Sequence, residues 1–402
     1  MSELPLSGVK VLDLSRLLPG PFCSLLLADL GAEVLKVEDT GMGDYVRWTP
    51  PYAGDDAARD RGVASAQFNA LNRNKKSIQL DLKQEAGKEI LLKLVAEHDV
   101  VLESFRPGVL DKLGVGYETM KTVNPAVVYC AITGYGQDGP FRLRAGHDMN
   151  YLGLNGLLGL TGAKDGPPVQ AAGQIADIGG GAQMAAIAIL AALIRQRATG
   201  EGANIDISMT DGAMSWLAMP AASALAGDAR RRGDVDLAGR WVCYMPYEAA
   251  DGWVSCGALE PKFWKSFCEG SGREDLIEQQ FELAGSDAWA GIAEVFKSKT
   301  RAEWAAFNAE RDCCIEPVLE LDEALASDLV SERGMVISVD QPGVGEVRQL
   351  APPFVFDGAR PDRREPAPGF GEHTDEVLSA LGYDAEAIAG LRESGAAKGV
   401  GA

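Results

Sequence analysis

Short runs rich in β-branched residues alternate with helical patterns along the first third of the chain. The runs are VKVLDLS (9–15), AEVLKVE (32–38), KSIQLDL (76–82), DVVLESF (99–105) and AVVYCAITGYG (126–136). Helical patterns such as EAGKEILLKLVAEH lie between them. This alternation is the βαβ pattern of a doubly wound, largely parallel sheet, so we predict an α/β fold.

The turn after the first strand lacks a dinucleotide-binding motif. The segment SRLLPGPFCSLLLADLG follows that strand, and its Pro21 suits a first helical turn, but no GxGxxG is present. This disfavours the usual kind of nicotinamide or flavin enzyme.

The character of the sequence changes after about residue 220. A helical stretch at about 180–197 and the strand IDISM (205–209) precede this point, whereas 221–240 is polar and without a strong period. We therefore predict a large domain over 1–220 and a connector over 221–240.

A second domain is expected beyond this connector. WVCYMPYEAADGWVSCGAL predicts a hairpin with Asp251-Gly252 as its turn, and amphipathic helices follow to about residue 326. We assign 241–329 to a smaller α+β domain. The segment 330–402 is a connector and C-terminal return, in which proline-rich 339–371 is an extended arm and GEHTDEVLSALG a capped helix.

The formal charge of −20 limits the partners of this chain. Nucleic acid and anionic membrane surfaces would be repelled, and a small anionic ligand would need a local basic pocket. Seven cysteines lack CxxC spacing, so we expect a reduced chain without disulfides and without a metal site. The N-terminus has no leader pattern and MAAIAILAALI (184–194) is too short to span a bilayer, so we predict a cytoplasmic protein.

His147 is one of only three histidines and stands between Gly146 and Asp148. Imidazole titrates near neutral pH and suits proton transfer, but a lone histidine is more often structural. By itself this residue leaves both interpretations open.

Several long segments resemble the family III CoA-transferases, also called the CaiB/BaiF family. They are GVKVLDLSRLLPGPFCSLLLADLGAEVLKVE, NRNKKSIQLDLKQEAGKEILLKLVAEHDVVLESFRPGVLDKLG, ITGYGQDGP and DIGGGAQMAAIAILAALIRQRATGEGANIDISMTDG. The resemblance covers nearly the whole length. It implies a CoA thioester ligand, a Rossmann-like large domain built from both ends of the chain, a small inserted domain and an interlocked homodimer.

Within that family the sequence is most similar to the α-methylacyl-CoA racemases. Transferases carry a nucleophilic aspartate at the position of Asp177, a glutamine where this chain has Leu18, and a glycine run that DLAGRWVCYM lacks. Racemases carry GHD thirty residues ahead of the same aspartate and a glutamate after the hairpin. This chain has His147, Asp177 and, in ALEP, Glu260.

Racemisation next to a thioester removes a proton from one face of the carbon and returns one to the other through an enolate. The resemblance implies that His147 and Asp177 are these two acid–base groups. Gly146 and Gly179–Gly181 would let backbone approach a planar substrate. We expect Asp177 to stay ionised beside the amino end of the 180–197 helix.

Two further groups complete the predicted catalytic set. The backbone N–H of Asp148 is the candidate donor to the enolate oxygen, and Glu260 is expected to pair with His147. Simpler roles exist: Asp177 could only cap its helix, and Glu260 could be a surface residue before Pro261. The family spacing of GHD favours the functional interpretation of His147.

The phosphates of CoA require local cations. Solvated surface charge is the simpler interpretation of any one basic residue, and Asp39 stands where some relatives have an arginine. Met149, Tyr151, Leu152 and Met214 are candidates for an acyl surface, although core packing is the commoner role. The residues that the resemblance places along the CoA groove are Asn72, Lys75, Phe105, Arg106, Lys112 and Arg144.

We therefore predict an acyl-CoA racemase of lipid metabolism that interconverts (2R)- and (2S)-2-methylacyl-CoA without a metal or redox cofactor, CoA being part of the substrate. The alternative is a CoA-transferase with Asp177 as nucleophile, forming an anhydride and then an aspartyl-CoA thioester. A non-catalytic acyl-CoA-binding protein is a third class, disfavoured by the His-Asp-Glu set. The sequence leaves the acyl group open.

Overall fold

The computed structural model describes residues 4–399, which form two compact units. Within these residues the first unit takes in the chain up to Asn155, Ala172–Trp216 and the chain from Ser331 onward. The second unit consists of Gly156–Ala171 and Leu217–Val330. The second unit thus includes 156–171 and 217–220, which lie within the predicted large domain of 1–220, as well as the predicted connector 221–240.

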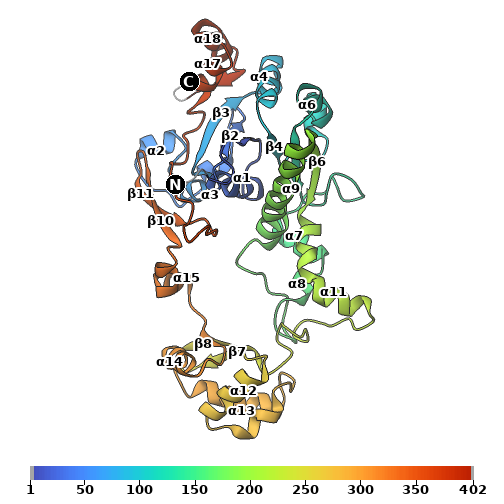
Figure 1. The fold of residues 1–402 in the computed structure, drawn as a ribbon, viewed down its shortest axis with the longest axis vertical. Coiled ribbons are helices and arrows are strands. Elements are labelled where there is room, and N and C mark those ends of the chain that lie inside the picture. The colour runs from blue at the N-terminus through green and yellow to red at the C-terminus, as the bar shows by residue number, and fades with distance from the viewer. Residues whose placement is uncertain (1–3, 400–402) are drawn as a thin grey trace. The chain divides into compact units, whose positions relative to one another are not determined.

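A seven-stranded sheet forms the centre of the first unit (Figure 1). Its order is β12-β3-β2-β1-β4-β5-β6, and all neighbours are parallel except β12 and β3. This confirms the predicted α/β fold with a largely parallel sheet. The strands are β1 (Lys10–Asp13), β2 (Glu33–Glu38), β3 (Lys75–Leu80), β4 (Val100–Glu103), β5 (Val128–Thr133), β6 (Ala203–Ser208) and β12 (Ala397–Lys398).

Apolar side chains of the strands and surrounding helices bury the sheet. One core cluster joins Ile78 of β3 and Val101 of β4 to Leu91 of α4 and Met120 of α6. The helices of the first unit up to Trp216 are α1 (Pro19–Asp29), η1 (Tyr45–Trp48), α2 (Asp56–Asp60), α3 (Ala66–Asn72), α4 (Glu85–Ala96), α5 (Val109–Leu113), α6 (Tyr117–Val123), α7 (Asp148–Leu154), η2 (Ile175–Gln183), α9 (Met184–Thr199) and α10 (Met209–Met214), with η3 (Ser215–Leu217) at its boundary.

The π-helical stretch η2 and α9 form one continuous helix over Ile175–Thr199. At 25 residues it is long and apolar enough to cross a membrane, which differs from the expectation of a shorter span. Buried core helices pass the same test, and half of its most apolar window is buried inside the protein. It packs against β5, β6, α1 and α10, as a core helix does.

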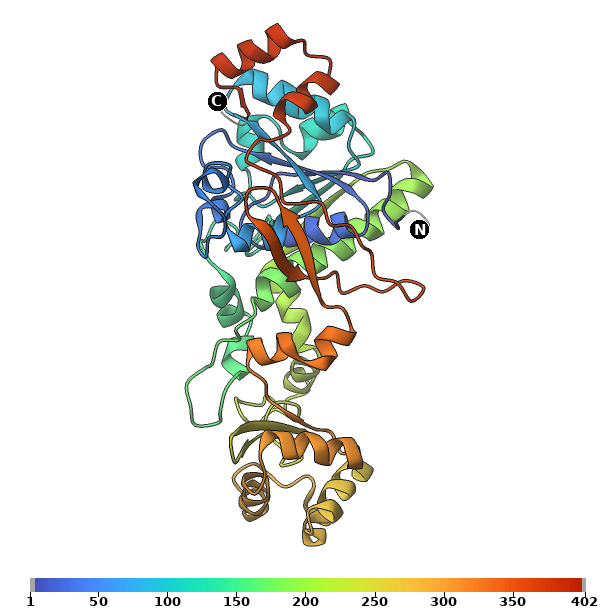
Figure 2. The ribbon, with the colours of Figure 1, turned by 90° about the vertical axis from the view of Figure 1, so that its left-hand side faces the viewer.

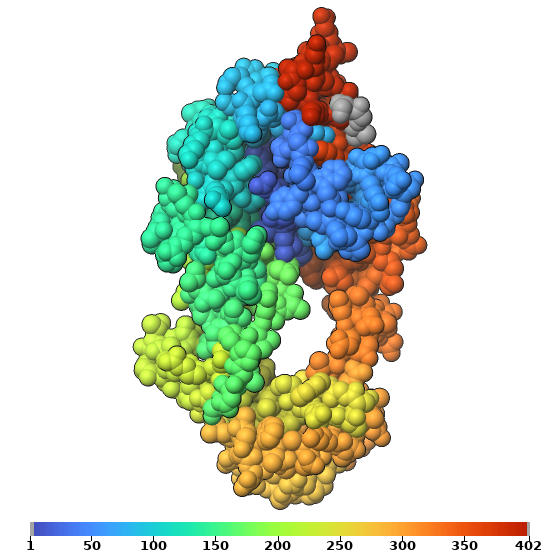
Figure 3. Space-filling model, turned by 180° about the vertical axis from the view of Figure 1, so that it is seen from behind, coloured from blue at the N-terminus to red at the C-terminus, as the bar shows by residue number. Residues whose placement is uncertain are grey.

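The C-terminal segment returns to the sheet beside the N-terminal part of the chain (Figures 2 and 3). The predicted extended arm contains an antiparallel hairpin, β10 (Val336–Gln341) and β11 (Gly345–Leu350), in place of a fully extended course. Helices α17 (Thr374–Ala380) and α18 (Ala385–Glu393) follow, and β12 pairs with β3.

The second unit contains a three-stranded antiparallel sheet of β7 (Tyr244–Ala249), β8 (Gly252–Gly257) and β9 (Ile315–Pro317). Ala249 pairs with Gly252, so the hairpin turns at Ala250-Asp251, one residue earlier than predicted. Stacked and tilted rings of Phe267, Phe296 and Trp304 fill its core. Its helices are α8 (Leu157–Leu160), α11 (Ala218–Leu225), α12 (Pro261–Gly270), η4 (Glu274–Gln279), α13 (Asp287–Lys297), α14 (Arg301–Arg311) and α15 (Leu321–Ala326), with α16 (Asp328–Glu332) at its boundary.

Candidate active site

Two pockets lie where the parallel strands end at their carboxyl edge. The strand order reverses between β1 and β4, and ligands of open α/β sheets bind at such a point. The basic pocket, of about 450 Å³, is lined by residues that include Arg16, Arg106, Arg142, Arg144, His147 and Asp177. The acidic pocket, of about 610 Å³, is lined by residues that include Glu38, Asp39, Asp44 and Asp81, and Arg16 and Phe105 line both pockets.

His147 is the N-cap residue of α7 and lies on the surface of the basic pocket. Its backbone N–H donates to the Asn150 side chain over 3.0 Å, which fixes the chain at the start of the helix. The exposed ring is therefore held on an anchored backbone and faces the pocket that also contains Asp177.

Asp177 lies within the first turn of η2, so it does not simply precede the helix as a cap. Burial, and secondarily the nearby Asp148, raise the pKa of its carboxyl from 3.8 to about 6, while His147 acts in the opposite direction. A helix terminus alone would lower this pKa, so the direction of the shift differs from that argument, but a carboxyl with a pKa of about 6 is still mainly ionised at neutral pH, as expected. A carboxyl with this pKa exchanges protons readily near neutral pH.

The Asp148 side chain has a role that its position in the sequence does not predict. The buried carboxylate accepts the backbone N–H groups of Ala176 over 2.7 Å and of Asp177 over 3.0 Å. It thus satisfies two of the donors that the start of η2 leaves open. Because Asp148 directly follows His147, one residue couples the positions of both predicted acid–base groups.

The glycines near these residues serve helix packing. A Cβ on Gly180 would lie 2.5 Å from the carbonyl oxygen of Met209 and 2.6 Å from the backbone nitrogen of Ala213. A Cβ on Gly146 would lie 2.7 Å from the Tyr151 ring. These contacts require glycine at both positions, and the predicted role of Gly146 and Gly179–Gly181 in substrate approach stays a prediction.

Four arginines surround the basic pocket, and within residues 4–399 none of their side chains is in an ion pair or hydrogen bond. Arg144 stacks over Phe141 at 3.7 Å and Arg16 over Tyr45 at 5.7 Å. Arg106 and Arg144 were predicted from the sequence, whereas Arg16 and Arg142 were not. Arg16 follows shortly after β1, and Arg142 lies five residues before His147. These positions next to predicted site segments are the sequence signal that could have identified them. Unpaired guanidinium groups in a chain of charge −20 are a ready anion site.

Asn72 and Lys75 differ from the expectation that their side chains contact CoA. Both are buried, and the Lys75 amine lies 2.9 Å from the Pro21 carbonyl, 3.0 Å from Asn72 Oδ1 and 3.5 Å from Asp13. Burial lowers the pKa of Lys75 to about 8 against the attraction of Asp13. The amine is used inside the protein, because a buried cation needs partners there.

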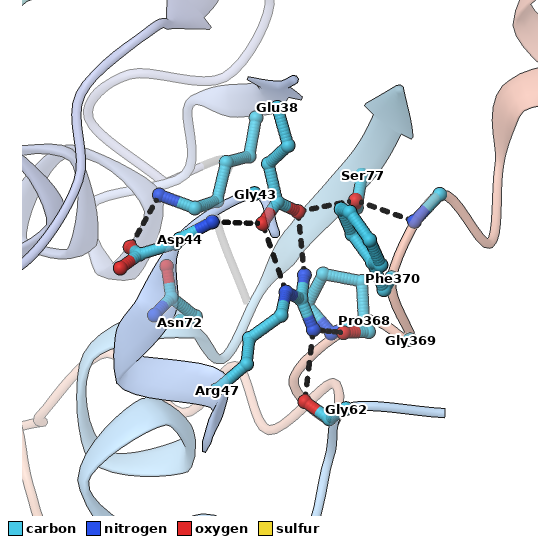
Figure 4. A network of polar contacts seen from close by, with 12 residues as sticks. Glu38, Gly43, Asp44, Arg47, Gly62, Asn72, Ser77, Pro368, Gly369 and Phe370 are labelled. Atoms are coloured by element: carbon cyan, nitrogen blue, oxygen red, sulfur yellow. Dashed lines mark hydrogen bonds and ion pairs between the residues drawn. The ribbon is translucent and has the colours of Figure 1, made fainter. Parts of the chain in front are cut away.

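The acidic pocket is backed by a closed network of charges (Figure 4). Glu38 accepts hydrogen bonds from Arg47 at 2.8 and 2.6 Å, from the Asp44 backbone at 3.0 Å and from Ser77 at 2.6 Å. Lys36 pairs with Asp44 at 2.9 Å. These charges are fully buried, and they neutralise one another.

The remaining predicted groove residues lie at or near the two pockets. Phe105 is half-buried and borders both pockets. Lys112 is exposed on α5, whose residues Val109 and Leu113 line the acidic pocket. Asp39 lines that pocket and accepts the Gly41 N–H.

Of the candidate acyl surface, Tyr151 and Leu152 are buried in the core, whereas Met149 and Met214 are 48% and 52% exposed. Tyr151 donates its hydroxyl to the Gly146 carbonyl over 2.5 Å. Tyr151 therefore supports the loop before His147 and also lines the basic pocket, whereas the two methionines are the exposed members of this set.

Glu260 belongs to the second unit, where it is the exposed N-cap residue of α12 before Pro261. Its carbonyl accepts the N–H groups of Phe263 and Trp264. The predicted pairing with His147 stays a prediction. Among residues 4–399 no group of three or more His, Cys, Asp or Glu side chains is arranged to hold a metal ion.

Comparisons with known proteins extend over nearly the whole chain. A model of CoA-transferase family III matches residues 6–374. An acyl-CoA transferase of Fusarium pseudograminearum (strain CS3096) is 35% identical, covering 98% of this chain and 88% of that protein. The human alpha-methylacyl-CoA racemase is 35% identical, covering 96% of this chain and 95% of the racemase. The crystal structure of a CAIB/BAIF family protein from Brucella suis superposes with a TM-score of 0.80 at 33% identity, over 94% of this chain and 100% of that one.

Proposed function

The chain belongs to CoA-transferase family III, and from that premise we propose that it is a racemase of 2-methyl-branched acyl-CoA thioesters. One acid–base group breaks the C–H bond next to the thioester carbonyl and takes the proton, leaving an enolate. A second group then donates a proton to the other face of the same carbon. His147 and Asp177 are the proposed pair.

The observation that carries this proposal is the shared pocket of His147 and Asp177. They come from two different elements, and Asp148 links these elements. The pKa of Asp177, raised to about 6, lets this carboxyl both take and return a proton near neutral pH. The C–H bond next to a thioester is far less acidic than either group, so in both directions the enolate must be stabilised as it forms.

The developing enolate oxygen needs hydrogen-bond donors. The Asp148 N–H stands at the first position of α7, where a helix supplies no internal acceptor. We keep this N–H as the proposed donor. The Asp148 carboxylate has the separate task of holding Asp177.

The unpaired arginines of the basic pocket favour a polyanionic ligand, and CoA carries several phosphate charges. We place its phosphates on Arg106 and Arg144, with Phe105 along the arm that joins them to the sulfur. CoA enters as part of the substrate, and the proposed reaction uses no metal or redox cofactor.

Glu260 lies in the second unit, whereas His147 and Asp177 lie in the first. We propose a homodimer in which the second unit of one chain supplies Glu260 to the His147 and Asp177 of the other chain. Exposed apolar side chains on α9, Ile187 and Ile194, offer surface for such an assembly. A cytoplasmic location, and the absence of nucleic-acid and membrane partners, remain part of this proposal.

Transfer of CoA between carboxylic acids is the second candidate. A partly exposed Asp177 beside free arginines also suits a nucleophile with an anionic acceptor acid, and one relative is named an acyl-CoA transferase. The Asp177 carboxylate would attack the thioester carbonyl and expel CoA, which leaves a mixed anhydride between Asp177 and the acyl group. The CoA thiolate would then attack the aspartyl carbonyl and give an aspartyl-CoA thioester and the free acid.

The test is exchange of the α-proton in D2O, with and without an added carboxylate acceptor. Exchange without acceptor supports the racemase, whereas CoA movement only with acceptor supports the transferase. His147→Ala should lower exchange on the order of 10²–10⁴-fold with CoA affinity little changed. His98→Ala is the control, because His98 lies two residues before β4 and lines neither the basic nor the acidic pocket. Full exchange in His147→Ala, or CoA trapped on Asp177 in the mass spectrum, contradicts the racemase.

Mixed subunits test the dimer. Co-expressed His147→Ala and Glu260→Ala chains should form heterodimers with one intact site and partial activity, while each mutant homodimer stays far less active. A fully active monomer in size exclusion with light scattering would contradict this assembly.

A further inference from the structure

Glu103 is a buried acidic residue with no cationic partner among residues 4–399. It ends β4 and is 4% exposed. One carboxylate oxygen accepts the backbone N–H of Phe105 over 2.6 Å, and the other accepts the hydroxyl of Tyr129, on the neighbouring β5, over 3.0 Å. A buried carboxylate held only by neutral donors is costly, so its presence at this edge of the sheet requires a reason.

The groups that face Glu103 are acidic or neutral. Burial first, then Asp111 of α5 and Asp206 of β6, raise its pKa to about 7, against the lowering effect of the Phe105 N–H and the Tyr129 hydroxyl. The same arrangement raises the pKa of Tyr129. Glu103 therefore stands near the midpoint of its titration at neutral pH.

Glu103 is bonded to the loop 104–108 through the backbone N–H of Phe105. Phe105 borders both pockets, and Arg106 and Pro107 line the basic pocket. Ser104 accepts the backbone N–H of Arg16, which lines both pockets. Arg16 and Phe105, which line both pockets, are thus each held by a backbone N–H bond. Arg16 donates to Ser104 and Phe105 donates to Glu103, and the bond to Glu103 is the shorter of the two.

We propose that Glu103 is the positioning residue of the ligand site: its carboxyl group fixes the loop 104–108, and it gains a proton when a CoA thioester binds to that loop. The proposal rests on the proposed function only in taking CoA as the ligand. Binding brings phosphate charge toward a carboxylate that lacks a cation, which favours its protonated form. The protonated acid keeps an oxygen that accepts the Phe105 N–H.

Binding of free coenzyme A, followed by isothermal titration calorimetry, tests this inference. Titrations near pH 7 in buffers of different ionisation enthalpy give the number of protons taken up. Wild type should take up a fraction of a proton more than Glu103→Gln, whose amide oxygen still accepts the Phe105 N–H but cannot titrate. Equal proton uptake in the two proteins would overturn the proposal.

Affinity and turnover separate positioning from folding. Glu103→Ala should raise the Kd of coenzyme A about 10-fold, the loss expected for a hydrogen bond to a charged group, and should raise KM more than it lowers kcat. Glu103→Gln and Tyr129→Phe should stay within about threefold of wild type, because each leaves the Phe105 bond in place. If Glu103→Ala does not fold, the Kd of coenzyme A is measured against pH in Glu103→Gln and in wild type. The same pH dependence in both proteins would overturn the proposal.

The outcome is independent of the proposed reaction. A wild-type protein that binds coenzyme A with this proton uptake, yet exchanges no α-proton, would end the racemase proposal and keep the role of Glu103. If the wild type is a racemase and its Glu103→Ala variant folds and binds coenzyme A normally, the racemase proposal stands and the role of Glu103 is refuted.

Discussion

The acidic and basic pockets meet at Arg16 and Phe105 but differ in how they treat charge. Behind the acidic pocket, Glu38 and Arg47 are buried and bonded to each other. In the basic pocket, Arg144 and its three companions have no anionic partner within the described chain, and Asp177 is partly desolvated.

This difference separates structural charges from functional ones. A closed buried network has no donor left for a ligand, and its loss is felt as instability. Open guanidinium groups contribute little to stability, but their free donors can bind an anion. Arginine occurs in both places, as Arg47 and as Arg144. Its partners therefore decide whether it stabilises the fold or is free to bind a ligand.

The largest expected effect is on stability at the closed network. Arg47→Met keeps apolar packing against Phe68 but leaves Glu38 buried without its cation. We expect a loss of about 3–5 kcal/mol in the free energy of unfolding, measured by urea denaturation. Arg144→Ala, with an exposed side chain, should change that free energy by less than about 0.5 kcal/mol. The double variant Arg47→Met/Glu38→Met should recover part of the loss, and an Arg47→Met protein as stable as wild type would remove the contrast.

The next effect is the pH dependence of stability that Asp177 creates. Its folded pKa of about 6 exceeds the ordinary 3.8, so the folded state holds a proton that the unfolded chain has released. The stabilisation is therefore complete below the unfolded value and is lost as pH rises through about 6. Relative to Asp177→Asn, wild type should lose about 2 kcal/mol between about pH 4 and 7 in urea titrations. Parallel pH profiles of the two proteins would contradict this.

A smaller effect is expected in ligand affinity at the open arginines. Arg106→Ala and Arg144→Ala should each raise the Kd of coenzyme A about 5- to 10-fold, and the dependence on salt should weaken. Arg59→Ala, an exposed arginine that lines neither pocket, serves as control. If all three variants bind alike, the open arginines are surface charge only.

The smallest effect concerns the acidic pocket. Asp39→Asn keeps an oxygen for the Gly41 N–H but removes a negative charge from the pocket next to the one in which we place the CoA phosphates. Coenzyme A affinity should rise about 2- to 3-fold at low salt, and the gain should fade as salt increases. An unchanged or weaker affinity would show that the Asp39 charge does not act on the bound phosphates.

The sequence predicted the parts of this molecule that depend on local pattern. Parallel strands are buried on both faces, so their apolar runs stand out, and each of the six predicted strands of the large sheet is present. His147 and Asp177 were placed in one site by motif and spacing. The structure brings them into one pocket.

What could not be predicted depends on pairings across long stretches of chain. Lys75 has the residue type of a phosphate contact, and its burial follows from Asp13, 62 positions earlier. The Asp148 side chain reaches backbone donors 28 and 29 residues ahead. Neither partner is visible in the neighbouring letters, and the effect of burial on Asp177 required the folded environment.

The contact from Arg47 to the Pro368 carbonyl spans 321 positions. Together with the pairing of β12 on β3, it means that the first unit cannot close until nearly the whole polypeptide has left the ribosome. The intervening second unit, with its own core, is free to fold while the first still waits for its last strand. During synthesis the β3 edge and the Arg47 donor that later bonds to Pro368 remain uncovered, so this interval is when the nascent chain most needs protection from aggregation.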